Sequence, residues 1–313
     1  MIETLPVNLV TTAILWLLVA AVASVFTALM YPLYKKLLDR TAPQDEAFAL
    51  MIYGLLPLAA AFLVMFLLNY PHLASALIPS HCHGQSCAPH RPELSLSHHG
   101  GTALIAIFAA VVFSVIVVIQ RKIAVTRSRL KALHKLSREG GDISYRTIDS
   151  PKLLAWCTGL IKPRVYVSTG LVAALSSRQL EAVLVHESSH GLRRDNLRKA
   201  ITGFATLLWP SLVRKRFLTD FAVATEKACD CLTAVKLKDS ALVLEVIHLM
   251  AGANPGNKDP SQQRQDSLTR LQQEQKGNLK ATLCNWLFIT GLWVASIVIL
   301  TGAAHLGVEW AIR

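Results

Sequence analysis

Three residues within five positions have the types and the spacing of a catalytic zinc site. His186, Glu187 and His190 form the pattern HExxH in a segment, 180–197, whose apolar residues recur at helical spacing. Histidines four residues apart lie one turn apart on the same helix face, so both imidazoles can reach one ion. A neighbouring carboxylate can accept a proton from a water that zinc activates. These residues therefore predict a zinc hydrolase with Glu187 as its general base.

A catalytic zinc site of this kind needs a third protein ligand from a separate element. Glu226, 36 residues after His190, is the candidate, because it stands in a polar and small-residue stretch that can form a second helix. Asp230, one turn later, could accept a hydrogen bond from a ligand histidine and fix its tautomer. The alternative third ligands are Asp195, His248 and Cys229. The competing interpretation of the motif is a surface helix that carries two histidines and no metal.

The composition indicates that these residues are held by a membrane protein. Apolar residues make up 52% of the 313 residues and charged residues only 17%. Long uncharged runs, each near the roughly 20 residues that cross a bilayer, occupy 8–30, 47–68, 101–120 and 283–303. We therefore predict an α-helical membrane protein with four transmembrane helices. A fifth run, 201–213, is shorter and contains Pro210, which favours an interfacial or buried helix over one that re-enters the bilayer.

The distribution of charge predicts the topology. Residues 121–280 carry 27 Lys or Arg against 14 Asp or Glu, and basic residues directly follow the first and third runs. Cytoplasmic segments are enriched in such residues. We therefore expect three transmembrane helices in 1–120, with an external loop at 69–100. The peptidase domain, 121–282, is then cytoplasmic, and 283–313 forms the fourth helix and a short external tail, so both termini are external.

Two alternative interpretations concern the same segments. The first run could be a cleaved signal peptide, because small residues at 21–24 resemble a cleavage site, but no basic residue precedes it and it continues to Met30. The basic balance could indicate nucleic-acid binding. Attraction of juxtamembrane residues to anionic lipid explains the placement of many of these charges equally well, so we expect the lipid bilayer as a partner and no direct nucleic-acid binding.

Two further segments have compositions of their own. The loop 69–100 contains six of the eleven histidines and two cysteines. This composition predicts either an external metal site or a Cys82–Cys87 disulfide, formed from His81, Cys82, His83 and Cys87. An ordinary polar loop is the remaining alternative. Residues 252–278 are rich in Gln, Asn, Gly, Lys and Pro. They predict a solvated linker with a short helix near 268–275, with a processing or docking segment as the alternative.

At these motifs the sequence resembles a known family. Residues 158–197, TGLIKPRVYVSTGLVAALSSRQLEAVLVHESSHGLRRDNL, are similar to the membrane peptidase domain of bacterial antibiotic sensor-transducers of the BlaR/MecR type. The matching features are Pro163, the run 175–181, HExxH, the pair Arg194–Asp195 and the ExxxD element 226–230. The family also has four spanning helices, with its peptidase domain between the third and the fourth. More distantly, the sequence resembles the HtpX-type membrane proteases.

The resemblance implies a fold, a ligand set and a location. The fold is an inserted α+β zincin-like domain of the gluzincin type, with 164–169 as a substrate-binding edge strand. His186, His190 and Glu226 are the zinc ligands, Glu187 is the general base and Asp230 supports a ligand histidine. The location is the bacterial inner (cytoplasmic) membrane, which the chain crosses several times. The sensors continue into an external penicillin-binding domain, whereas this sequence stops at Arg313, so β-lactam sensing by this polypeptide is not expected.

The leading functional hypothesis is a zinc-dependent endopeptidase that performs regulatory proteolysis in signal transduction. Its substrate would be a protein or peptide, for which a BlaI/MecI-type repressor and the chain itself are the candidates. One alternative is a non-catalytic receptor that binds metal in its external loop. The other is a housekeeping membrane protease of the HtpX type. The intact motif together with Glu226 favours catalysis, because a purely structural zinc site has no need for Glu187.

Overall fold

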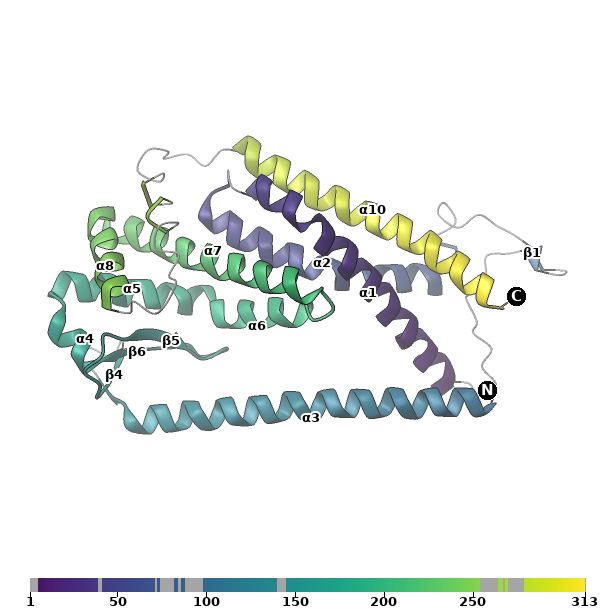
Figure 1. Ribbon diagram of the computed structural model, residues 1–313, viewed down its shortest axis with the longest axis horizontal. Coiled ribbons are helices and arrows are strands. Elements are labelled where there is room, and N and C mark those ends of the chain that lie inside the picture. The colour runs from purple at the N-terminus through teal and green to yellow at the C-terminus, as the bar shows by residue number, and fades with distance from the viewer. Residues whose placement is uncertain are drawn as a thin grey trace.

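The computed structural model describes residues 5–38, 41–70, 72–73, 82–83, 86–87, 98–139, 145–253, 264–266, 268–269 and 279–312. Helices dominate the chain (Figure 1). The long helices are α1 (Leu5–Leu38), α2 (Pro43–Asn69), α3 (His98–Leu136), α7 (Ser211–Leu237) and α10 (Leu279–Ile312). The shorter ones are α4 (Thr169–Ala174), α5 (Ser177–Arg193), α6 (Asp195–Ala205) and α8 (Ser240–Ala253).

Three helices are long and apolar enough to cross a bilayer. Among the described residues these spans are Thr12–Leu38, Pro43–Asn69 and Thr282–Leu306, which agree with three of the four predicted runs. The predicted run 101–120 lies inside the helix α3, but many of its side chains fall outside the described residues. The fourth span and the orientation of the chain therefore stay predictions.

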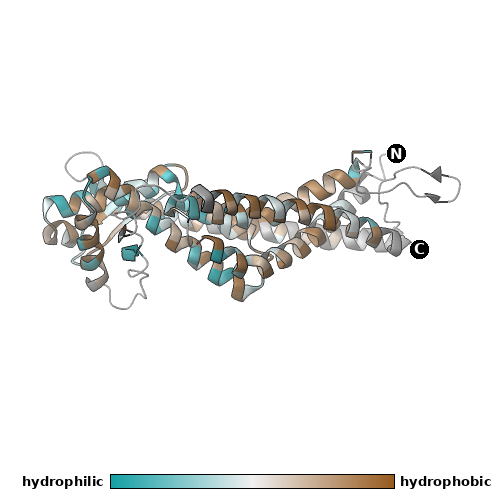
Figure 2. Ribbon diagram, turned by 90° about the horizontal axis from the view of Figure 1, so that it is seen from above, coloured by the Kyte–Doolittle hydropathy of each residue, from teal (hydrophilic) through white to brown (hydrophobic). Residues whose placement is uncertain are grey.

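The three apolar helices lie side by side and leave the polar elements at one end. α1, α2 and α10 contact one another, while α3 runs along the other side of the molecule (Figure 1). Hydrophilic residues gather at the end that carries the sheet, and α1 begins and α10 ends at the opposite end (Figure 2). This arrangement is the one that a membrane bundle with a polar domain on one side requires.

A four-stranded sheet stands beside α5. Its strands are β3 (Arg138–Glu139), β4 (Tyr145–Ile148), β5 (Ala155–Thr158) and β6 (Arg164–Ser168), in the order β3-β4-β6-β5. β4 pairs with β6 in parallel, and the other pairs are antiparallel. The expectation that 164–169 forms the edge strand is therefore wrong. The apolar residues Val165, Tyr166 and Val167 are buried, as suits an inner strand, and β3 and the half-buried β5 are the two edge strands of the described sheet.

Local sequence signals set the ends of α5. Ser176 and Gln179 form a capping box, in which each side chain bonds the other residue's backbone N–H. The helix ends at Arg193, and the left-handed backbone of the next residue, Arg194 (φ 53°), turns the chain directly into α6. On its buried face, Ala182 and Val183 pack against β6 and α4. The motif helix is thus fixed at both ends and along one face.

α7 packs against the apolar helices as well as against α5. Phe217 and Phe221 are buried in one core with Tyr31, Tyr53 and neighbouring residues of α1 and α2. A Cβ atom at Gly54 of α2 would lie 3.1 Å from the Phe217 ring and 3.3 Å from Thr202 of α6, so glycine permits this close approach. The elements of the predicted peptidase domain therefore share a core with the membrane helices.

Two lysines from different helices converge on one buried acid. Glu46 of α2, only 4% exposed, accepts hydrogen bonds from Lys35 of α1 (2.8 Å) and Lys227 of α7 (3.0 Å). A buried carboxylate requires such partners. This cluster ties α7 to the ends of the first two apolar helices.

Two predicted segments are only partly described. Cys82–His83 (β1) and Ser86–Cys87 (β2) pair as an antiparallel ribbon in which Cys82 is opposite Cys87. His81 and the side chains of this ribbon lie outside the described residues, so the metal site and the disulfide both stay predictions.

In 252–278, Leu268 is fully buried against α7 and α8. The solvated-linker interpretation is therefore wrong at Leu268.

We predict that Glu46→Gln lowers the free energy of unfolding by about 2–3 kcal/mol, because it leaves two partly buried ammonium groups facing a neutral amide. Thermal unfolding of the detergent-solubilised protein measures the change. Asp239→Asn is the matched control. Asp239 pairs with Arg178, which is 73% exposed, and its loss should cost less than about 1 kcal/mol. Equal unfolding midpoints for the two variants would contradict the prediction.

Candidate metal centre

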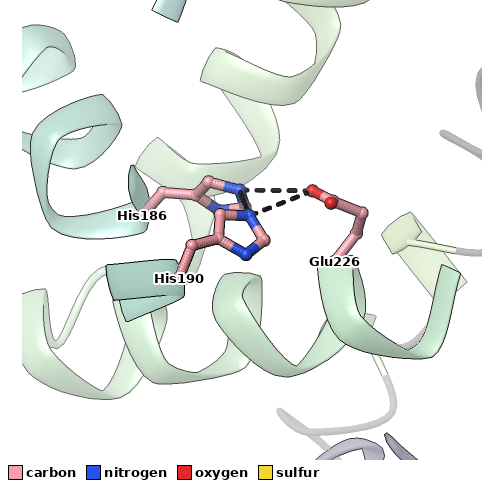
Figure 3. A group of neighbouring side chains, drawn as sticks. All are labelled: His186, His190 and Glu226. Carbon is pink, nitrogen blue, oxygen red and sulfur yellow. Dashed lines mark hydrogen bonds and ion pairs between the residues drawn. The ribbon is translucent and has the colours of Figure 1, made fainter. Parts of the chain in front are cut away.

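Three side chains from two helices converge on one point. His186 and His190 project from α5, and Glu226 projects from α7 toward both rings (Figure 3). The two Nε2 atoms are 3.2 Å apart, and each lies 3.4 Å from Oε2 of Glu226. Together these atoms form a group that could hold a metal ion.

The spacing of these three atoms suits a tetrahedral ion. Zinc binds imidazole nitrogen and carboxylate oxygen at about 2.0–2.1 Å, and the edges of such a tetrahedron are about 3.3–3.4 Å long. The observed separations of 3.2–3.4 Å agree with these edges. Three donors leave a fourth position for water or substrate, as in catalytic sites. The donor set therefore fits zinc, although the ligand roles themselves stay predictions.

Each histidine is oriented by a carboxylate on its other ring nitrogen. His186 Nδ1 lies 3.0 Å from Asp230 Oδ1, and His190 Nδ1 lies 2.9 Å from Asp195 Oδ2. Both carboxylates are almost fully buried. Such partners place the proton on Nδ1 and leave Nε2 free to bind an ion.

The carboxylates are in turn held by arginines. Arg264 makes two hydrogen bonds to Asp230, of 2.7 and 2.8 Å, and Arg193 bonds Asp195. Burial raises the pKa of Asp230, but the Arg264 and His186 contacts outweigh it, so the pKa lies below its ordinary value. Asp230 is therefore ionised at neutral pH and can accept a hydrogen bond from the Nδ1–H group of His186.

Asp195 and Cys229, two of the alternative third ligands, lie on the other side of His190. Cys229 Sγ is 3.3 Å from His190 Nδ1 and 3.4 Å from Asp195 Oδ2. With His190 these two residues form a second group whose atoms lie close enough to hold an ion, but they meet His190 at Nδ1 and lie away from His186 Nε2. The structure thus places Glu226, and neither of these two residues, against the Nε2 atoms of both histidines.

Glu187 faces a cavity beside the three donors. The cavity, of about 130 Å³, is lined by His186, Glu187 and Glu226, by Ala155 of β5, and by the α8 residues Val243, Val246, Ile247 and Met250. Within the described part of the chain, no hydrogen bond or ion pair engages the Glu187 carboxylate. This group is therefore free to bond a water or a substrate in the cavity.

The structure adds residues that the sequence analysis did not assign to the site. Asp195 was considered only as an alternative ligand, although its position after the left-handed Arg194 is what turns it back toward His190. Lys199 approaches the second oxygen of Glu226 at 3.5 Å. Arg264 had no sequence signal, because it stands in the segment interpreted as a linker.

We predict that His190→Ala and Glu226→Ala lose bound zinc, because each removes one of three donors. Asp195→Asn should keep zinc but weaken its affinity about 10- to 100-fold, because it loosens the orientation of His190. Zinc content by metal analysis and affinity by chelator competition measure both effects. Asp239→Asn, remote from the site, is the control. Undiminished zinc in the two alanine variants would refute this ligand set.

We predict that zinc affinity continues to rise with pH above neutrality. Burial lowers the pKa of His186 and His190, but their hydrogen bonds to Asp230, Asp195, Cys229 and Glu226 outweigh it, and in the metal-free protein the pKa is raised. Zinc binds neutral imidazole and must displace these protons, so acid disfavours binding. Chelator competition from pH 6 to 8.5 tests this. A plateau above about pH 7.5, expected for ordinary histidines, would contradict it.

Comparison with known proteins identifies a family for the part of the chain that carries this site. The model of peptidase family M48 matches residues 100–259, about half of the chain, and the match includes both histidines, Glu187 and Glu226. No curated protein and no solved structure matched. With a peptidase model covering the elements that build this three-donor group, the chain belongs to peptidase family M48.

Proposed function

We propose that this protein is a membrane-embedded zinc endopeptidase that performs regulatory, site-specific proteolysis. The observation that carries the proposal is the unpartnered Glu187 carboxylate in the same cavity as His186 and Glu226. Membership of a metallopeptidase family and three apolar helices support the broad activity and the membrane location. The bacterial inner membrane, with the peptidase elements on its cytoplasmic side, is part of the proposal.

The proposed chemistry assigns one task to each side chain. His186, His190 and Glu226 would hold zinc, which supplies a Lewis acid that polarises the scissile carbonyl and the attacking water. Glu187 accepts the proton of that water on its carboxylate and then delivers it to the leaving amine nitrogen. Asp230 and Asp195 keep the two imidazoles in one orientation throughout the cycle.

The free edge of β5 is the proposed binding place for the substrate backbone. Among the described residues β5 pairs with β6 alone, and an antiparallel ladder directs every second residue's N–H and C=O to the open side. The side chain of Asn196 already bonds the carbonyl of Cys157 at 3.0 Å. An extended peptide therefore pairs best near Ala155, which lines the cavity beside the donors. The apolar α8 wall of this cavity favours an apolar substrate side chain.

Two features support a regulatory role over a housekeeping one. The resemblance of 158–197 to antibiotic sensor-transducers suggests a BlaI/MecI-type repressor, or the chain itself, as substrate. Lys227 directly follows the candidate ligand Glu226 and bonds Glu46, which also bonds Lys35. A displacement of α1 against α2 would therefore reach the metal centre through a short chain of contacts.

We predict that Glu187→Gln retains zinc and loses at least 99% of peptidase activity, because the amide cannot accept a proton. Cleavage of a co-expressed reporter and zinc content are measured in the same samples. Glu181→Gln is the matched control, since Glu181 is exposed on the same helix. Full cleavage by the Glu187 variant would sink the peptidase assignment and favour a non-catalytic receptor.

A second measurement separates regulation from housekeeping. The purified protein in nanodiscs is incubated with a folded winged-helix repressor and, separately, with an unfolded model protein, and mass spectrometry maps the products. A regulatory peptidase should cut the repressor or its own chain at one or two sites. Cleavage of the unfolded protein at many sites, with the repressor left intact, would favour the HtpX-type alternative.

A further inference from the structure

The connection between α6 and α7 exposes a set of large apolar side chains. α6 ends at Ala205 and α7 begins at Ser211, so the two helices form a hairpin with a short turn. Phe204 is 56% exposed, Leu207 58% and Leu212 84%. With the exposed side chains of Ile201 and Leu208 they define what we call the hairpin tip. In water, the exposure of this apolar surface would cost free energy.

The opposite face of the hairpin is already packed on a membrane helix. Thr202, Ala205 and Trp209 are buried, and Thr202 and Phe217 lie against Gly54. Gly54 lies within Pro43–Asn69, one of the candidate spans. The hairpin tip therefore lies beside a helix that is long and apolar enough to cross a bilayer.

Charge marks the limits of this apolar surface. Residues 200–213 contain no charged side chain, and residues 196–219 contain five cations and no anion. Lys215 and Arg216 are exposed just beyond the tip. An apolar stretch of this length flanked by cations is typical of a segment that lies at a bilayer interface, where basic side chains meet anionic headgroups.

We propose that the α6–α7 hairpin tip inserts into the bilayer leaflet nearer the metal centre. Its apolar side chains enter the boundary between headgroups and acyl chains, and Lys215 and Arg216 bind anionic headgroups. The occupant of this surface is thus lipid, and not a protein partner. The hairpin adds a fixed point of membrane contact within the peptidase elements, besides the long apolar helices.

Insertion of the hairpin also fixes the distance between the metal centre and the membrane surface. α6 begins at Asp195, which orients His190, and Ile201 of the hairpin tip stands less than two turns further along the same helix. The centre therefore lies close to the membrane surface. If the proposed peptidase function holds, the scissile bond belongs to a substrate segment that can approach the bilayer.

Site-directed spin labelling of the full chain in nanodiscs tests the insertion. Leu212→Cys carries the label, and the signal of the labelled parent protein, which contains the native cysteines, is subtracted. Val235→Cys is the matched control, because Val235 is 68% exposed on the same helix at its other end. We expect the label at 212 to be several-fold more accessible to oxygen than to a water-soluble nickel chelate, and the label at 235 to show the reverse.

Equal access of the nickel chelate to both labels would overturn the insertion. The headgroup contact has its own test, in which the charge reversal Lys215→Glu with Arg216→Glu should increase nickel access at 212 in anionic nanodiscs and leave it unchanged in zwitterionic ones. An equal change of nickel access in anionic and zwitterionic nanodiscs would overturn the proposed contact with anionic headgroups. Because the readout involves no cleavage, a failure here is distinguishable from a failure of the peptidase assignment.

Discussion

The packing of α7 against α5 is the constraint on which the rest of the structure depends. Two histidines of one helix turn can present their Nε2 atoms side by side, but a third donor must arrive from another helix at a distance fixed by metal geometry. Glu226 meets this condition only because α7 lies across the motif face of α5. The same approach brings Asp230 to His186, so one helix supplies both a donor and an orienting carboxylate.

α7 also packs into the core formed by the apolar helices. The position of the metal centre therefore depends on how these helices pack. Phe217 and Phe221 in the first half of α7 are buried among aromatic residues of α1 and α2, and its second half carries Glu226 and Asp230. Within the second half, Lys227 directly follows Glu226 and bonds the buried Glu46. If α7 moves as a rigid helix, a displacement of the apolar helices would change the geometry of the donors. This coupling is the physical basis for the proposed regulation.

Local patterns in the sequence predicted several features. The uncharged runs predicted four spanning helices, and three described helices are long and apolar enough to span a bilayer, because hydropathy is a property of consecutive residues. The HExxH spacing placed two imidazoles on one face of a helix for the same reason. The edge strand was assigned wrongly, because strand order depends on which segments meet in space. Likewise Arg264 contacts Asp230 across 34 residues, and no local signal marks such a contact.

The sequence by itself determined that this chain carries a histidine-glutamate motif on a helix, apolar helices and a basic segment between them. Periodicity, hydropathy and charge are properties of consecutive residues, so they can be determined without knowledge of the fold. Only the tertiary structure decided that Glu226 meets both histidines, that Asp195 orients His190 from the next helix, and that β5 has the open edge. These facts depend on contacts between residues distant in sequence, which the packing of the whole chain selects.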